Sequence, residues 1–356
     1  MSDAMIEESA ARLFSQNVDR ALLERFERGE FPRRLWDLVA ENGLPLALAT
    51  EEAGGIGASW ADAWPILRGA GYWSVPLPLA STMIAALMLS KAGQSVPDGP
   101  VALIDEEAGA GLRLAGGALH GAVRRVAWAR HCPHALAAVG GELVLVALAG
   151  KAALTERLNP AREPDDAVAF DGAPLLAQFD NPFASLHKPL RAFGALATSA
   201  MMVGAMEWLL EQSVQYATDR VQFGRPIGRN QAIQQNLAQM AGDIGSARMA
   251  AAIACEDAPH AGAVDRPNAL FSIAVAKVRA GEAGTRAAAI SHQVHGAIGF
   301  TYEHMLNYAT RRLLSWREAH GSDGEWAIRL GEAAIAARAG GFWTSLTARQ
   351  FEGLHA

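Results

Sequence analysis

The stretch Tyr216-Ala-Thr-Asp-Arg-Val-Gln-Phe-Gly-Arg-Pro-Ile-Gly-Arg-Asn-Gln231 decides which fold this chain is expected to adopt. It follows a long apolar helical pattern, which the Phe223-Gly224 pair breaks. Gln231 opens a second helical pattern, in which apolar residues recur at helical spacing as far as Ile244. The stretch is therefore predicted to join two long helices, with Arg220 just before the break, where a side chain can reach out of the helices.

Long helices are predicted on both sides of this junction. The segment 192–217 is almost entirely apolar and rich in Ala, Gly and Met, which is typical of a helix buried on all sides. Further helical patterns cover about 231–244 and beyond, about 267–295 and about 303–316. Four helices in series favour an antiparallel bundle.

The first 95 residues are also predicted to be helical. The segment 31–43 carries Pro32 near its start and ends at Gly43, and Ser59 is a suitable N-cap for a helix over 60–70. The loop Gly54-Gly55-Ile-Gly57 before that helix is interpreted as a turn rather than a phosphate site, because no strand precedes it and no P-loop lysine follows it.

The hydrophobic period changes between about 100 and 185. Short apolar runs are separated by Gly-Gly, Asp-Gly and Pro, which is typical of short strands joined by turns. The predicted fold class is α+β and mainly α. A helical domain over 1–98 precedes a small β domain over 99–186 and a helical bundle domain over 187–356.

Composition limits the function classes. The formal net charge is −6 and no long basic run occurs, so a nucleic-acid partner is not expected. Cys132 and Cys255 lack metal-type spacing, so no metal site is expected, and we predict two buried, reduced thiols in a cytoplasmic protein. The N-terminus lacks an apolar signal core, and no window of about 18 uncharged apolar residues is apparent, so no membrane span is expected.

Several motifs, taken in order, resemble those of the acyl-CoA dehydrogenase family over nearly the whole chain. Near the N-terminus these are Glu51-Glu-Ala-Gly-Gly-Ile-Gly57 and Val75-Pro-Leu-Pro-Leu-Ala-Ser-Thr82; near the C-terminus they are Arg220-Val-Gln-Phe-Gly-Arg-Pro-Ile-Gly228 with Gln231, and Gln293-Val-His-Gly-Ala-Ile-Gly-Phe300. The resemblance implies oxidation of an acyl-CoA thioester to its 2,3-enoyl-CoA. It also implies transfer of the electrons to an external acceptor, such as a flavoprotein.

The resemblance assigns a cofactor, FAD, to particular residues: Arg220, Gln222, Phe223, Gln293 and Gly296. An arginine fork suits the paired oxygens of a pyrophosphate, Phe223 can pack on the adenosine half, and glycine permits close backbone approach. In the family these groups reach the FAD of a neighbouring subunit. The implied assembly is a tetramer, either a homo-oligomer or a heterotetramer with a sister subunit.

The catalytic base of the family has no counterpart at its usual positions. One position is a Glu-Gly pair after the last bundle helix, and here it reads His320-Gly321. The other is a Glu near the start of the first long bundle helix, and the segment 190–198 contains no carboxylate.

Three explanations stay open. The base has moved to Glu318, Asp323 or Glu325, or His320 itself accepts the proton. Alternatively, the chain is a non-catalytic structural partner in a heteromer of the kind associated with bulky substrates such as steroid side-chain thioesters.

The middle domain also departs from the family. The Thr-Glu-Pro-x-x-Gly-Ser-Asp segment, which helps to cover the flavin in the family, is matched only weakly here, by Glu106-Glu-Ala-Gly-Ala-Gly111. Trp128 is interpreted either as an aromatic that faces the flavin or as a core tryptophan.

Overall fold

The N-terminal part of the molecule is a layer of helices. The computed structural model describes residues 3–150, 152–262, 268–301, 304–350 and 354. The layer contains α1 (Asp3–Asn17), α2 (Arg20–Glu27), α3 (Arg33–Glu41), α4 (Trp60–Tyr72) and α5 (Leu79–Lys91), with short 3-10 helices η1 (Leu44–Leu46) and η2 (Glu51–Ala53) between α3 and α4. The predicted N-cap is confirmed, since Ser59 and Asp62 form a capping box at the start of α4.

A seven-stranded sheet follows the helical layer. Its strands are β1 (Val101–Ile104), β2 (Arg113–Ala115), β3 (Ala118–Ala127), β4 (His134–Val139), β5 (Glu142–Ala147), β6 (Ala152–Thr155) and β7 (Asp165–Asp180), and it also carries the short 3-10 helices η3 (Ala108–Gly111) and η4 (Ala129–His131). The order is β1-β4-β5-β7-β3-β2, with β6 beside β7; β1 is parallel to β4 and the other pairs are antiparallel. The apolar runs predicted most of these strands. They did not predict β6 or the second half of β7, whose side chains are largely exposed.

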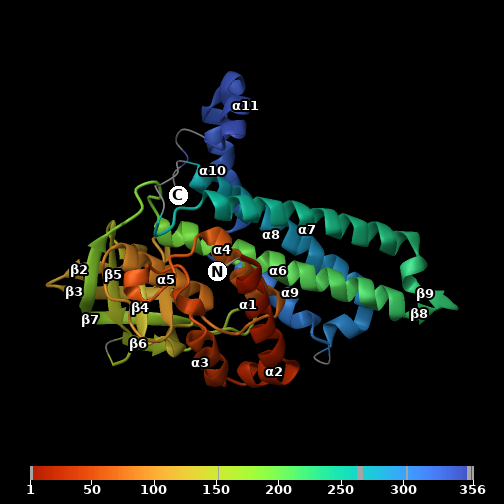
Figure 1. Cartoon of the computed structure of the whole chain (residues 1–356), viewed down its shortest axis with the longest axis horizontal. Helices are drawn as coiled ribbons and strands as arrows, with labels where there is room; N and C mark the ends of the chain where they lie inside the picture. The colour runs from red at the N-terminus through yellow and green to blue at the C-terminus, as the bar shows by residue number, and fades with distance from the viewer. Residues whose placement is uncertain (1–2, 151, 263–267, 302–303, 351–353, 355–356) are drawn as a thin grey trace.

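The C-terminal part is a bundle of long helices (Figure 1). It contains α6 (Pro189–Asp219), α7 (Gln231–Asp257), α8 (Ala269–His295) and α9 (Leu306–Glu318). The junction between α6 and α7 is a hairpin of β8 (Val221–Gln222) and β9 (Arg225–Pro226) followed by η5 (Ile227–Arg229), and η6 (Gly296–Phe300) follows α8. Figure 1 shows the hairpin at one end of the bundle and the sheet at the other.

Two further helices correct the prediction of four. They are α10 (Asp323–Ala336) and α11 (Arg338–Ala348), the second of which projects from the body in Figure 1. Asp323 and Glu325 therefore lie in the first turn of a helix capped by Ser322, not in an acid-rich loop. Acidic residues are favoured there by the helix dipole, which explains their clustering without a catalytic role.

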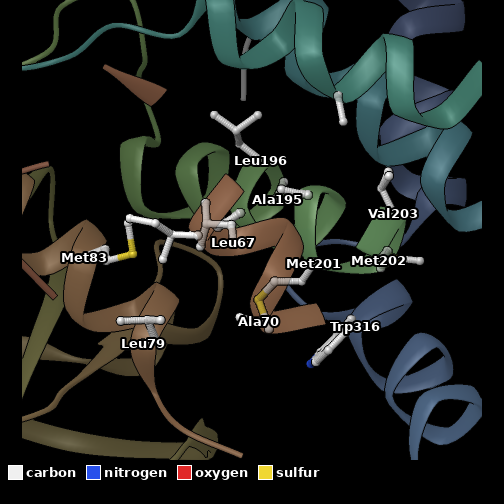
Figure 2. Close-up of a cluster of buried hydrophobic side chains, with 14 of the residues drawn as sticks. Leu67, Ala70, Leu79, Met83, Ala195, Leu196, Met201, Met202, Val203 and Trp316 are labelled. Atoms are coloured by element: carbon white, nitrogen blue, oxygen red, sulfur yellow. The ribbon is translucent and has the colours of Figure 1, made fainter. Parts of the chain in front are cut away.

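Helix α6 forms the centre of the core. Figure 2 shows side chains of α6 between Leu67 of α4, Met83 of α5 and Trp316 of α9. Two glycines allow α4 and α6 to touch through their backbones. A Cβ on Gly71 would lie 1.8 Å from the carbonyl oxygen of Met201, and a Cβ on Gly204 would lie 1.9 Å from that of Arg68.

Burial also explains why α6 is so apolar. Contrary to the sequence-based expectation, an 18-residue window of α6 reaches a mean hydropathy of 1.4, which passes the length and composition test for a membrane span. Inside the protein 83% of that window is buried, so the helix meets its hydrophobic partners within the fold.

The two cysteines are buried and free, as predicted. Burial raises the pKa of both thiols, which therefore stay protonated and unreactive at neutral pH.

Candidate active site

A cleft lies where the helical layer, the sheet and the bundle meet. Its cavity measures about 450 Å³. Leu77 before α5, Leu103 of β1 and Met201 of α6 line it with apolar surface. Charged and polar groups also line it, among them Asp105, Glu107, Arg125, Arg191, Glu318, His320 and Glu325. Apolar surface beside convergent polar groups is common in small-molecule sites.

His320 reaches this cleft from the turn between α9 and α10. Two consecutive left-handed residues make the turn, His320 at φ 56° and Gly321 at φ 91°. The carbonyl oxygen of His320 accepts a hydrogen bond from Nε1 of Trp326 at 3.1 Å. The strained backbone of His320 is therefore held in place by its neighbours.

The His320 ring is oriented by Asp105, which follows β1. His320 Nδ1 lies 2.8 Å from a carboxylate oxygen of Asp105, and the backbone N–H of Ala108 donates to the same carboxylate at 3.0 Å. Burial raises the pKa of Asp105, but the hydrogen bond and charge of His320 outweigh burial and hold that pKa at about 2. Asp105 is therefore an ionised acceptor for the imidazole Nδ1–H.

The His320 ring also packs against α6, at Gly194. A Cβ on Gly194 would lie 2.4 Å from Cγ of His320, so only glycine leaves room for the ring. Gly194 belongs to the segment 190–198, the second region in which the resemblance led us to expect a catalytic carboxylate. The two regions thus meet in space, and here they supply an imidazole and a glycine.

An acidic triplet at the end of β1 ties the sheet to the start of α6. Besides Asp105, Glu106 accepts hydrogen bonds from the backbone N–H groups of Leu190 (3.1 Å) and Arg191 (3.0 Å), and Glu107 pairs with Lys188 at 2.6 Å. Carboxylates are stabilised at a helix N-terminus. Sequence reasoning missed this role of the triplet, although three acids directly after a buried strand were a usable signal.

Lys277 of α8 stabilises the turn between α9 and α10 that carries His320. Its Nζ is fully buried and donates to the carbonyl oxygens of Trp316 (2.6 Å) and Ala319 (2.8 Å), and lies 3.3 Å from the hydroxyl of Thr198. Desolvation lowers the pKa of Lys277 to about 7, against the weaker opposing effect of nearby acids. The ammonium group caps the last turn of α9, directly before His320. The sequence signal was a single lysine within an apolar helical face.

The other base candidates lie in different surroundings. Glu318 is exposed at the edge of the cleft. Glu325 lines the cleft but pairs with Arg191. Asp323 is not among the lining residues; it is buried and pairs with Arg317 at 2.8 Å. The structure therefore does not bring Asp323 to the cleft, because it is the first residue of α10 and faces the protein.

Of the two interpretations of Trp128, that of a core tryptophan is confirmed. Its side chain lines the cleft, and its ring lies 5.4 Å from that of Phe26 between ring centroids. Only 8% of the residue is exposed, so it is a core tryptophan that also forms part of the cleft wall.

The predicted cofactor residues lie at the other end of the bundle. Arg220, Gln222 and Phe223 are exposed on the β8–β9 hairpin, and the Phe223 side chain is completely exposed. Gln293 is exposed at the end of α8, where its side chain accepts a long hydrogen bond of 3.5 Å from Asn236 of α7, and Gly296 follows at φ 62°. Within the described ranges no carboxylate pairs with the Arg220 guanidinium.

The length of α6 separates this group from the cleft. Met201, which lines the cleft, and Arg220 are 19 residues apart along α6 and its C-cap, which corresponds to about 28 Å at 1.5 Å per residue. No arginine side chain spans that distance. The exposed group of Arg220 and Phe223 is therefore separate from the cleft of this chain.

Comparisons with known proteins agree with this architecture. The family models "Acyl-CoA dehydrogenase, N-terminal domain" and "Acyl-CoA dehydrogenase, C-terminal domain" match residues 2–95 and 191–334. The chain is 30% identical to acyl-CoA dehydrogenase IpdE2 of Mycobacterium tuberculosis over 89% of this chain and 91% of that protein.

Solved structures share the fold. A Tcur3481–Tcur3483 steroid ACAD variant has a TM-score of 0.82 at 23% identity, covering 93% of this chain and 96% of that one. The ChsE4–ChsE5 complex from Mycobacterium tuberculosis has a TM-score of 0.79 at 21% identity, covering 94% and 97%. Since family models match both helical parts and a relative aligns along nearly the whole length, the chain belongs to the acyl-CoA dehydrogenase family of oxidoreductases.

Proposed function

We propose that the chain is a subunit of an FAD-dependent acyl-CoA dehydrogenase that converts an acyl-CoA thioester to its 2,3-enoyl-CoA. The observation that carries the proposal is the cleft between the three parts of the molecule. There the two regions expected to hold the base come together, at His320 and Gly194. The thioester would bind in this cleft, against the apolar side chains of Leu103 and Met201.

The residues present fit FAD. Arg220 offers a guanidinium that pairs with no carboxylate among the described residues and suits a pyrophosphate. Phe223 offers an exposed aromatic face and Gly296 an open backbone at the same end of the bundle. Gln222 and Gln293 supply further polar groups beside them. The chemistry that FAD supplies when bound is acceptance of the hydride from the substrate β-carbon, with the electrons then leaving to an external acceptor flavoprotein.

The separation of about 28 Å along α6 between Met201 and Arg220 supports an oligomer in which these FAD-binding residues act on a neighbouring subunit. The partner would be a second copy or a sister subunit, in a tetramer within the cytoplasm. Two structural relatives are themselves named as pairs of proteins, and one as a steroid ACAD. Those names favour a heteromer and a bulky acyl chain. The proposed division into 1–98, 99–186 and 187–356 follows the change from helices to sheet to bundle.

A second candidate function is a non-catalytic structural subunit of such a heteromer. It is favoured by a specific observation, namely that neither position expected to hold the base carries a carboxylate. One position holds His320, and the other, the segment 190–198, contains no acidic residue. In that case the sister subunit would provide the base.

A spectroscopic experiment tests both candidates. The chain is purified alone and together with its genetic neighbour, the visible spectrum is recorded, and acyl-CoA thioesters of different bulk are added without oxygen. Yellow protein that bleaches with a thioester supports the dehydrogenase. Yellow protein that bleaches only with the neighbour present supports a heteromer. Protein that stays colourless in both preparations contradicts FAD binding and with it the proposed function.

A further inference from the structure

The structure assigns a proton-accepting role to an Asp105–His320 pair in this chain's own cleft, in place of the carboxylate that the family uses. The inference rests on the proposed function and names the group that takes the α-proton of the thioester. The atom that would take it is Nε2 of His320. Three observations support the assignment. The ring is held in one orientation, Nε2 has no hydrogen-bond partner among the described residues, and most other carboxylates of the cleft are paired with cations.

The ring of His320 is held in one tautomer. A carboxylate oxygen of Asp105 lies 2.8 Å from Nδ1 and accepts the hydrogen bond, so in the neutral imidazole the proton lies on Nδ1 and Nε2 carries the lone pair. Gly194 supports the ring face, and the Trp326 indole fixes the His320 carbonyl at 3.1 Å. A buried carboxylate that orients a histidine is a common arrangement when the histidine acts as a general base.

The free nitrogen of the ring is available to a ligand. Among the described residues no donor or acceptor lies within hydrogen-bonding distance of His320 Nε2, and that atom is not buried without a partner. The His320 side chain is 23% exposed and lines the cavity of about 450 Å³. The side chain that carries Nε2 is therefore accessible to a molecule in the cleft.

The acids that line the cleft are less suited to the task. Glu325 pairs with Arg191, and Glu107 pairs with Lys188 at 2.6 Å, which lowers the pKa of Glu107 and weakens it as a base. Asp165 pairs with Arg125 at 2.6 Å. Glu163 forms a buried pair with Arg312 at 3.0 Å, with side chains only 4% and 1% exposed.

Among the described residues, none pairs with the exposed carboxylate of Glu318 and none orients it. Among the described groups of the cleft, His320 alone combines orientation by a carboxylate with a free basic atom.

The proton step balances without an oxidant. The Cα–H bond of the thioester breaks, the proton forms a bond with Nε2, and the electron pair remains on the enolate, chiefly on the thioester oxygen. The resulting imidazolium is stabilised by the ionised Asp105. Return of the proton regenerates the thioester, so in D₂O the pair should exchange the α-protons of a bound acyl-CoA for deuterium.

The first test measures this exchange with octanoyl-CoA in D₂O, followed by NMR, on the full chain in its purified complex without oxygen. We expect His320→Gln to slow exchange by at least about 100-fold, the usual contribution of a positioned base, and Asp105→Asn to slow it about 10-fold or more. His320→Glu, which restores the family's carboxylate, should recover exchange.

The matched control is His120→Gln, which removes a histidine that pairs with Asp171 at 3.8 Å outside the cleft and should change nothing. Equal exchange rates for the wild type and His320→Gln would overturn the proposal.

The second test reads the tautomer without substrate or cofactor. In ¹⁵N-histidine NMR spectra, the signal lost in His320→Gln should belong to an Nδ1–H tautomer, and Asp105→Asn should alter it while leaving the His120 signal in place. A signal of the Nε2–H tautomer would remove the basic atom from the cleft and overturn the proposal. The two proposals can fail separately. A His320→Gln complex that stays yellow and still bleaches with acyl-CoA would retain the dehydrogenase and place its base elsewhere.

Discussion

Replacing Lys277 by methionine should change how stability depends on pH. Lysine has an ordinary pKa of 10.5, and burial lowers the pKa of Lys277 in the folded state to about 7. Between these two values the unfolded chain binds more protons than the folded one, so the free energy of unfolding rises with pH. The destabilising contribution is complete below pH 7, shrinks as pH rises, and disappears above about pH 10.5.

The magnitude follows from the two pKa values. Each unit of difference is worth about 1.4 kcal/mol, and between pH 7 and pH 9 the wild type should gain about 2 kcal/mol relative to Lys277→Met. The methionine variant also loses the donors to Trp316 and Ala319, which costs about 1–3 kcal/mol for each carbonyl left unsatisfied and does not depend on this titration. The two effects separate because only the first varies with pH.

The assay is urea unfolding of both proteins at several pH values from about 6 to 9. Lys91→Met is the control for loss of a lysine, because Lys91 is only partly buried and donates to the Ala261 carbonyl at 2.7 Å. Titration of the two buried thiols affects wild type and variants alike and cancels in the difference. Parallel curves for wild type and Lys277→Met would refute the reasoning, since they would mean that Lys277 keeps its proton throughout this range.

The remaining predictions concern cofactor retention, helix packing and a buried ion pair. Arg220→Ala should sharply reduce the flavin absorbance that survives gel filtration, whereas the neighbouring Arg229→Ala should not; equal loss in both would contradict the specific role of Arg220. Gly204→Ala should lower the free energy of unfolding by at least about 1 kcal/mol, because its Cβ would overpack against α4; helix propensity alone predicts a gain of about 1 kcal/mol, so the sign decides. Glu163→Gln should destabilise the protein by about 3–5 kcal/mol in urea unfolding, because it leaves the buried Arg312 without its counter-charge, and a loss under about 1 kcal/mol would show that the pair contributes little.

Local signals in the sequence were sufficient for most helices. The apolar stretch predicted over 192–217 is the middle of α6, and Ser59 caps α4 as its side chain and position suggested. Such features depend on hydrogen bonds and packing between residues a few positions apart, which a sequence displays directly. The sequence analysis did not predict α10 and α11. The acidic residues at the start of α10 were interpreted as a loop, because Ser322 was not recognised as the N-cap of a helix.

The contents of the cleft could not be obtained in this way. Asp105 and His320 are 215 residues apart, and Lys277 meets Ala319 across 42 residues, so no periodicity relates them. Sequence alone named His320 as one of several possible bases and omitted Asp105 altogether. Asp323, another of those bases, is turned into the protein by its place at the start of α10.

The sequence by itself determined the family and the order of helices, sheet and bundle, because these depend on short motifs and on hydrophobic period. Only the tertiary structure decided that Arg220 lies about 28 Å along α6 from Met201, which lines the cleft of the same chain. It also decided that Asp105, at the end of β1, lies against the His320 ring. The physical reason is that a site's chemistry depends on distances between side chains, and these are fixed by packing among elements that are remote along the chain.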